Sequence, residues 1–143
     1  MMRRLIVAIG TAVLGAAAYR LFQELLAPGF LPSSGYIGLA VGAIGSTLAF
    51  YDSRPRGWLS YLRPAMLIVE VTIACVGVSV GASSALAKHP LDLSDVFGAV
   101  GFMLFFGLIF ASWWLVPAHA TILWATNRLA SNTESTGRDG PSP

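Results

Sequence analysis

The chain has 143 residues, of which 55% are hydrophobic and only 11% are charged, and its mean hydropathy is +0.69. A soluble domain usually carries about 25% charged residues, so this composition argues against a soluble domain and indicates an integral membrane protein. The lone cysteine, Cys75, excludes an intrachain disulfide. The small formal charge of +2 gives no reason to expect nucleic-acid binding.

Four apolar segments are candidates for membrane spans, since about 20 apolar residues cross the hydrocarbon core. The sequence therefore predicts an all-α fold, a bundle of four transmembrane helices in a single domain over residues 1–130. The predicted spans cover about residues 5–26, 36–51, 65–87 and 96–117. The second span is short and is bracketed by Tyr36 and Tyr51, aromatic residues that suit the membrane interface.

The beginning of the chain has a second interpretation. The stretch "MMRRLIVAIGTAVLGAAA" has the charged start, apolar centre and Ala16-x-Ala18 end of a cleavable signal peptide. We favour an uncleaved first helix, because "RLFQELL" continues the helical pattern beyond that point. Cleavage would leave three spans with the same topology.

The last predicted span lies in an apolar stretch that is too long for one straight crossing. This stretch runs over residues 96–125, so we expect the span to end near Pro117. The segment "AHATILWATNRLA" would then be a tilted or interfacial helix. The polar residues 131–143 are expected to be disordered.

The basic residues fall mostly on one side of these spans. With a cytoplasmic N-terminus, seven of the nine lie inside and two, Arg20 and Lys88, lie outside. The inside residues are Arg3, Arg4, Arg54, Arg56, Arg63, Arg128 and Arg138. This asymmetry predicts that both termini are cytoplasmic. The short, arginine-rich style of the chain favours the inner membrane of a bacterium, with several crossings.

One carboxylate, Glu70, interrupts the apolar run "PAMLIVEVTIACVGVSVG". An acid at membrane depth normally finds a partner, faces water or becomes protonated. We expect an intramembrane polar cluster of Glu70 with His119, Arg63 and Asp52; Arg56 and a residue of another protein are further candidate partners. Snorkelling to the interface, contact with a partner protein, and proton or ion handling all remain open for Glu70.

Small residues recur on one face of each of two predicted helices. The third span carries Ala74, Gly77 and Gly81 on the face of Glu70, and the second carries Gly38, Gly42 and Gly45 on a face that reaches Asp52. Because small residues let helix backbones approach in lipid, we expect these two helices to pack closely, antiparallel to each other. Chance matches are frequent for such spacing.

Signatures of catalysis and of cofactor binding are missing from the sequence. It has no P-loop, GxGxxG, HExxH or GxSxG motif. Two histidines and one cysteine do not make a four-ligand zinc site, and His89 and His119 fall on opposite sides of the predicted topology, which argues against bis-histidine haem. We therefore expect neither a metal nor a cofactor.

The size and four-span layout are loosely similar to the small membrane subunits of tripartite transporters that depend on a substrate-binding protein. "PGFLP" before a glycine-rich helix is the local similarity, and it assigns no role to any residue.

These observations favour a non-enzymatic accessory or scaffold subunit that packs, within the lipid bilayer, against a larger membrane protein or against itself. The alternatives are a small proton- or ion-linked transporter or channel component that uses Glu70, a holin-like pore former, and an enzyme acting on lipid headgroups through Glu70, His119 and inner-loop arginines. The nearly neutral tail fits a holin poorly.

Overall fold

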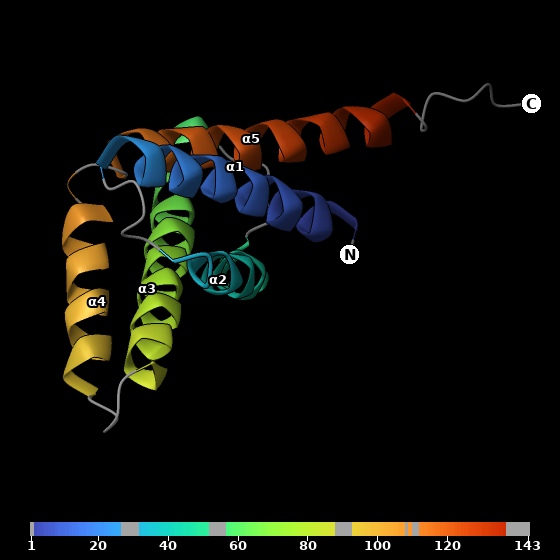
Figure 1. Ribbon diagram of the computed structural model, residues 1–143. Helices are drawn as coiled ribbons and strands as arrows, with labels where there is room; N and C mark the ends of the chain where they lie inside the picture. Colours follow the sequence, from blue (N-terminus) through green and yellow to red (C-terminus); the bar gives the residue numbers. More distant parts are fainter. Residues whose placement is uncertain are drawn as a thin grey trace, which may run out of the picture.

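The computed structural model describes residues 2–26, 32–51, 57–87, 93–107, 109 and 112–136. Over these ranges helices are the only regular secondary structure, which confirms the predicted all-α class (Figure 1). The elements are α1 (Met2–Leu26), α2 (Gly35–Phe50), the 3₁₀ helix η1 (Trp58–Tyr61), α3 (Leu62–Leu86), α4 (Leu93–Phe106) and α5 (Ser112–Thr136).

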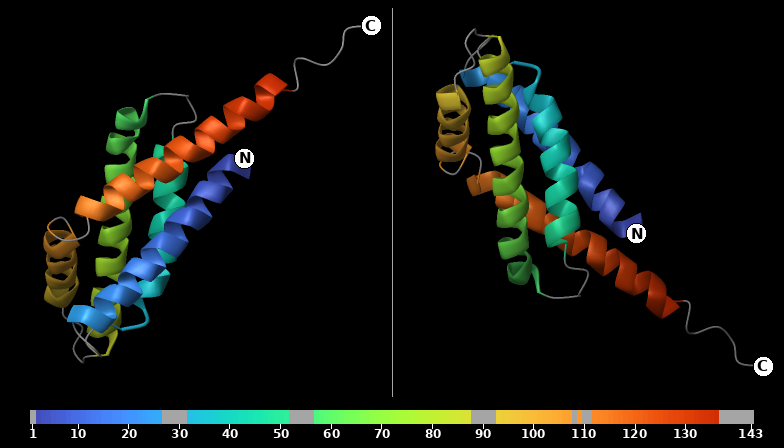
Figure 2. Two further views of the ribbon diagram at one scale, coloured as in Figure 1. Left: turned by 90° about the horizontal axis from the view of Figure 1, so that it is seen from above. Right: turned by 90° about the horizontal axis from the view of Figure 1, so that it is seen from below.

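Helix α3 is the centre of the arrangement, because α2, α4 and α5 all pack against it. Helix α4 runs beside α3 in every view, whereas α1 and α5 lie across α3 and beside each other (Figures 1 and 2). Helix α1 packs on α2 and α5. The C-terminal end of α5 projects beyond the other helices (Figure 2).

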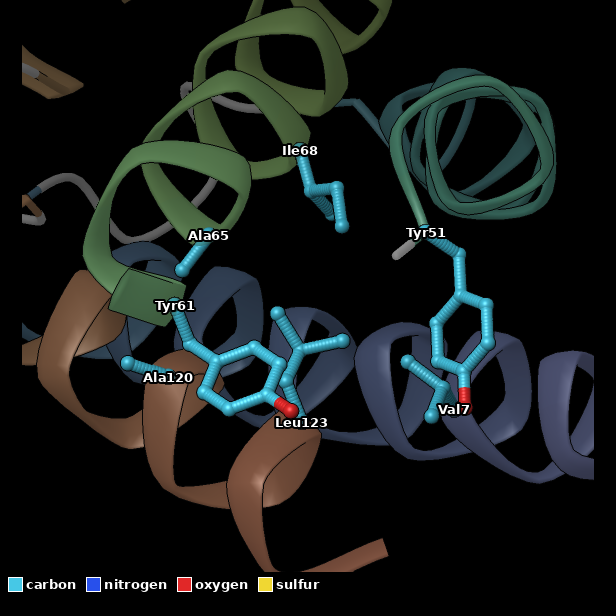
Figure 3. Packing of buried hydrophobic residues seen from close by; sticks show 7 residues of the cluster. All are labelled: Val7, Tyr51, Tyr61, Ala65, Ile68, Ala120 and Leu123. Atoms are coloured by element: carbon cyan, nitrogen blue, oxygen red, sulfur yellow. The ribbon is translucent and has the colours of Figure 1, made fainter. Parts of the chain in front are cut away.

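Two apolar clusters hold the helices together. The first surrounds the N-terminal end of α3 and joins all the elements except α4 (Figure 3). Its members are Val7, Tyr51, Tyr61, Ala65, Ile68, Ala120 and Leu123. The second lies further along α3, where Val76 and Val80 meet Tyr19, Leu39 and Met103. Each helix therefore buries one face and leaves another exposed.

Within the described residues, two helical segments are long and apolar enough to cross a membrane: Met2–Leu25, and Trp58–Leu86, which joins η1 to α3. They correspond to the first and third predicted spans. Helix α2 has 16 residues and is about 24 Å long at 1.5 Å per residue, which is less than the roughly 30 Å of a hydrocarbon core. The four-span bundle therefore stays a prediction.

The fourth predicted span, 96–117, is not one continuous helix. Helix α4 ends at Phe106 and α5 begins at Ser112, and the two helices point in different directions (Figure 1). Gly107 lies at this corner against α3, where an added Cβ would be 2.8 Å from the Ile73 side chain. Gly107 and Ile109 have π-helical geometry, which is a common cause of sharp changes in helix direction, and the Ser112 hydroxyl donates to the Gly107 carbonyl oxygen, 3.2 Å away.

Pro117, where we expected the helix to end, lies inside α5. A proline ring has no N–H, so the helix lacks one hydrogen bond at this position but continues. Helix α5 also extends to Thr136, into the segment 131–143 that the sequence predicts to be disordered. Extending an existing helix avoids the cost of nucleation, which explains how this polar stretch is helical. Residues 137–143 lie outside the described part.

Candidate functional site

Helix α2 meets α3 through two of the glycines that the sequence singles out. An added Cβ on Gly38 would collide with the Cys75 carbonyl oxygen and lie 2.7 Å from the Ser79 Cβ. One on Gly42 would lie 2.8 Å from the Thr72 Cα. Contacts this short require glycine, so the two backbones approach as closely as expected for helices packed in lipid.

The opposing face of α3 differs from the expected one. Thr72, Cys75 and Ser79 meet α2, whereas Gly77, expected to face α2, packs against α4: its added Cβ would lie 2.8 Å from the Val100 Cα. Gly81 is buried and Ala74 is half-buried. Gly45, expected on the packing face of α2, has no atom within 4 Å of an added Cβ.

Glu70 is half-buried on α3. It lies two helical turns before Gly77 and one turn before Ile73, on the side that meets α4 and Gly107. Among the described residues, no hydrogen bond or ion pair joins Glu70 to His119 or to Arg63, which is exposed. Asp52 and Arg56 lie outside the described residues. The structure therefore does not bring Glu70 and His119 into one bonded cluster.

His119 lies instead at the contact between α5 and α1. Its side chain is 2% exposed, and its Nε2 is 2.7 Å from the Thr11 hydroxyl oxygen. The Thr11 hydroxyl already donates to the Val7 carbonyl oxygen, 2.8 Å away, so it accepts from His119. A neutral ring then carries its proton on Nε2. Nδ1 is buried with no hydrogen-bond partner among the described residues.

A second polar contact, which the sequence did not predict, joins α2, η1 and α5. The Tyr51 hydroxyl donates to Asn127 Oδ1 at 2.7 Å, and Asn127 Nδ2 donates to the Tyr61 hydroxyl at 3.0 Å. All three side chains are buried. The only sequence signal was an asparagine directly after the largely apolar run "TILWAT", and its partners lie 66 and 76 residues away.

Aromatic and basic side chains surround this contact. The Arg4 guanidinium lies 6.0 Å from the centre of the Tyr51 ring, and that of Arg128 lies 5.0 Å from the Trp124 ring. The Trp58 indole N–H donates to the Thr121 hydroxyl at 3.2 Å. Such pairs are typical of the headgroup level of a membrane.

Metal-ligating and ion-paired side chains are sparse in the described part of the chain. This part contains no group of three or more His, Cys, Asp or Glu side chains placed to hold a metal ion. The ion pair of Arg20 with Glu24, at 2.8 Å, is exposed and lies within α1. The buried polar groups contact one another between helices, which is an arrangement suited to fixing helix positions.

An apolar pocket of about 380 Å³ lies between α1, α3, α4 and the start of α5. Its floor includes the buried side chains of Leu39, Val76, Met103 and Leu115. Leu21, Leu25 and Trp114 line it and are substantially exposed, so they form its rim.

Comparisons of the chain with protein-family models, with curated proteins and with solved structures found no match.

Proposed function

We propose that this chain is a small, non-enzymatic membrane protein of the bacterial inner membrane that serves as an accessory or scaffold subunit. Several of its helices would cross the bilayer with both termini in the cytoplasm. Its partner would be a larger membrane protein or a second copy of the chain.

The supporting observation is the outward-facing apolar surface of the helices. Helix α1 is apolar enough to cross a membrane, yet only 22% of its most apolar 18-residue stretch is buried. Helix α2 likewise exposes Ile37, Val41, Ile44 and Leu48, each more than half exposed. Exposing this much apolar surface to water would cost about 25 cal/mol per Å², so lipid or protein must cover it.

Helix α4 supports a role for protein contact in addition to lipid. Gly98 and Gly101 have no atom within 4 Å of an added Cβ, and Phe97 and Phe105 beside them are 75% and 61% exposed. In lipid, small residues such as these glycines let another helix backbone approach, and the phenylalanines beside them offer apolar surface for it to pack on. We therefore place the partner's contact on α4.

The test is photocrosslinking in native membranes from a probe residue at position 101, followed by mass spectrometry. A probe at position 71, beside Glu70, examines the α3 side, and a probe at Ile9 of α1, 55% exposed, is the control. We expect position 101 to capture one membrane protein reproducibly and the control to capture lipid. Lipid adducts alone from every position, with a monodisperse monomer in mild detergent, would contradict the proposal.

A second candidate function is a proton- or ion-linked transporter component. Its support is the corner between α4 and α5, which lies near the face of α3 that carries Glu70; discontinuous helices often border ion sites in transporters. Glu70→Gln should then abolish pH-dependent flux in proteoliposomes, while Glu24→Gln, which alters an exposed acid of α1, should not. Unchanged flux in Glu70→Gln, or no flux in the native protein, would exclude this function.

A further inference from the structure

The apolar pocket between α1 and the α4–α5 corner is a defined space for a ligand. Its volume of about 380 Å³ falls within the roughly 300–1,000 Å³ of typical small-molecule sites. It is bounded on two sides by α1 and α3, the helices long and apolar enough to cross a membrane. Its exposed rim residues, Leu21, Leu25 and Trp114, would face hydrocarbon in a bilayer.

The polar groups of the pocket wall show which chemistry it fits. The hydroxyls of Thr11 and Thr72 donate to the carbonyl oxygens of Val7 and Ile68 within their own helices, at 2.8 Å and 2.7 Å. The Tyr19 hydroxyl donates to the Pro32 carbonyl oxygen at 2.8 Å.

His119 is the fourth polar side chain of the pocket wall. Its Nε2 is bonded to Thr11, and its Nδ1 is shielded from solvent-sized molecules. These four side chains therefore present no unbonded donor to an occupant, and Trp114, the remaining polar side chain of the lining, lies at the exposed rim. A polar ligand would lose its own hydrogen bonds to water on entering, at a cost of about 1–3 kcal/mol for each group, whereas a hydrocarbon would lose none.

The shape of the pocket also bears on its occupant, because side chains of α1, α2, α3, α4 and α5 all line it. A partner's helix with its side chains is a rigid rod about 10 Å across, whereas a hydrocarbon chain is slender and bends to follow the space between these walls. A single flexible hydrocarbon chain meets both conditions, that of shape and that of polarity.

We propose that this pocket holds one acyl chain of a membrane lipid, inserted between α1 and the α4–α5 corner. The proposal depends on the membrane placement given above and adds a specific lipid site to it. The bound chain would fill the space that the tight α2–α3 and α3–α4 contacts leave on the α1 side.

The experiment uses the full chain reconstituted in vesicles of phosphatidylglycerol, a fraction of which carries a photoactivatable diazirine in one acyl chain. Labelled residues are located by mass spectrometry. Val76 and Met103 are the informative positions, because they line the pocket but are only 6% and 8% exposed, so bulk lipid does not reach them. Exposed Ile44 and Leu48 of α2 report ordinary contact with the bilayer.

The variant is Ala18→Phe, which places a ring in the pocket from a half-buried lining position. Ala17→Phe is the matched control, since Ala17 is the exposed neighbour. We expect label at Val76 and Met103 in the native chain and in Ala17→Phe, and its loss in Ala18→Phe. Leu21→Trp, at the exposed rim, should give the same loss and is the second variant in case Ala18→Phe does not fold.

Three other labelling patterns would overturn the proposal, and each points to a different reason. Label confined to α2 and other exposed faces of the native chain would show a membrane protein with an unoccupied pocket. Equal label at Val76 and Met103 in all variants would show that the label arrives by another route. No label at any position would contradict the membrane placement itself, and with it the proposed function.

Discussion

Helix α3 is held by two kinds of contact that differ in how closely the backbones approach. Toward α2 and α4, glycines bring backbones together so closely that an added methyl group at Gly38 or Gly77 would meet backbone atoms. Toward α5, the contacts run through larger side chains such as Leu123. On the α1 side, where a buried hydrogen bond of His119 with Thr11 joins α5 to α1, a pocket remains. Glycine contacts thus bring backbones together, whereas contacts through larger side chains leave space.

The largest effect should come from Gly38→Ala, which forces a methyl group onto Cys75 and Ser79 of α3. Overpacking of this kind typically costs about 1–3 kcal/mol, and we expect the upper part of that range because the obstacle is backbone. Gly45→Ala is the matched control: with open space around it, it should gain up to about 1 kcal/mol from helix propensity. Unfolding in mixed detergent micelles measures both, and equal effects would remove the distinction between the two glycines.

Asn127→Ala should have the next largest effect, because it removes the side chain that bonds both Tyr51 and Tyr61. Interhelical hydrogen bonds in membranes average about 0.6 kcal/mol each and reach about 1.7, so we expect a loss of about 1–2 kcal/mol. Tyr61→Phe, which removes one of the two bonds, should lose about half as much. The same unfolding assay checks this; full stability in Asn127→Ala would show that the contact does not hold α5 in place.

A smaller effect on stability is expected at two buried threonines, of which Thr11 is hydrogen-bonded to His119 and Thr47 has no hydrogen-bond partner among the described residues. Thr11→Val removes the acceptor of His119 Nε2 and should cost about 0.6–1 kcal/mol. Thr47→Val makes the same change at a hydroxyl that is buried without a partner among the described residues, so it should be neutral or stabilising. If the two variants unfolded alike, the His119–Thr11 bond would contribute nothing.

The smallest effect is expected at the exposed pair of Arg20 and Glu24. Surface ion pairs of this kind contribute little, so Glu24→Gln should leave the unfolding midpoint unchanged at low and high salt. A clear loss at low salt alone would mean that the pair stabilises α1 after all.

The sequence predicts the first three helices to within a few residues, because each is a separate apolar run bounded by turn-forming or polar residues. It missed the corner between α4 and α5, since "GFMLFFGLIFASWW" is almost continuously apolar and no breaker marks the π-helical geometry at Gly107 and Ile109. Pro117, the obvious breaker, lies inside α5.

The candidate site was predicted less well than the helices. Residue spacing identified Gly38 and Gly42 as packing positions but not their opposing residues, since the rotation of α3 is set by all its neighbours at once. Tyr51, Tyr61 and Asn127 were missed because each alone is a common interfacial residue, and only the fold brings them together.

The central claim, that α2 packs on α3 within a membrane, is tested most directly by disulfide trapping. Ser46 and Thr72 face each other across these helices with their hydroxyl oxygens 3.3 Å apart, so Ser46→Cys with Thr72→Cys, in a Cys75→Ser background, should form an intrachain disulfide in alkaline-washed membranes. Gly45→Cys with Thr72→Cys should not, because Gly45 faces open space. Absence of the first disulfide, equal formation in the control, or loss of the chain in the wash would contradict the account.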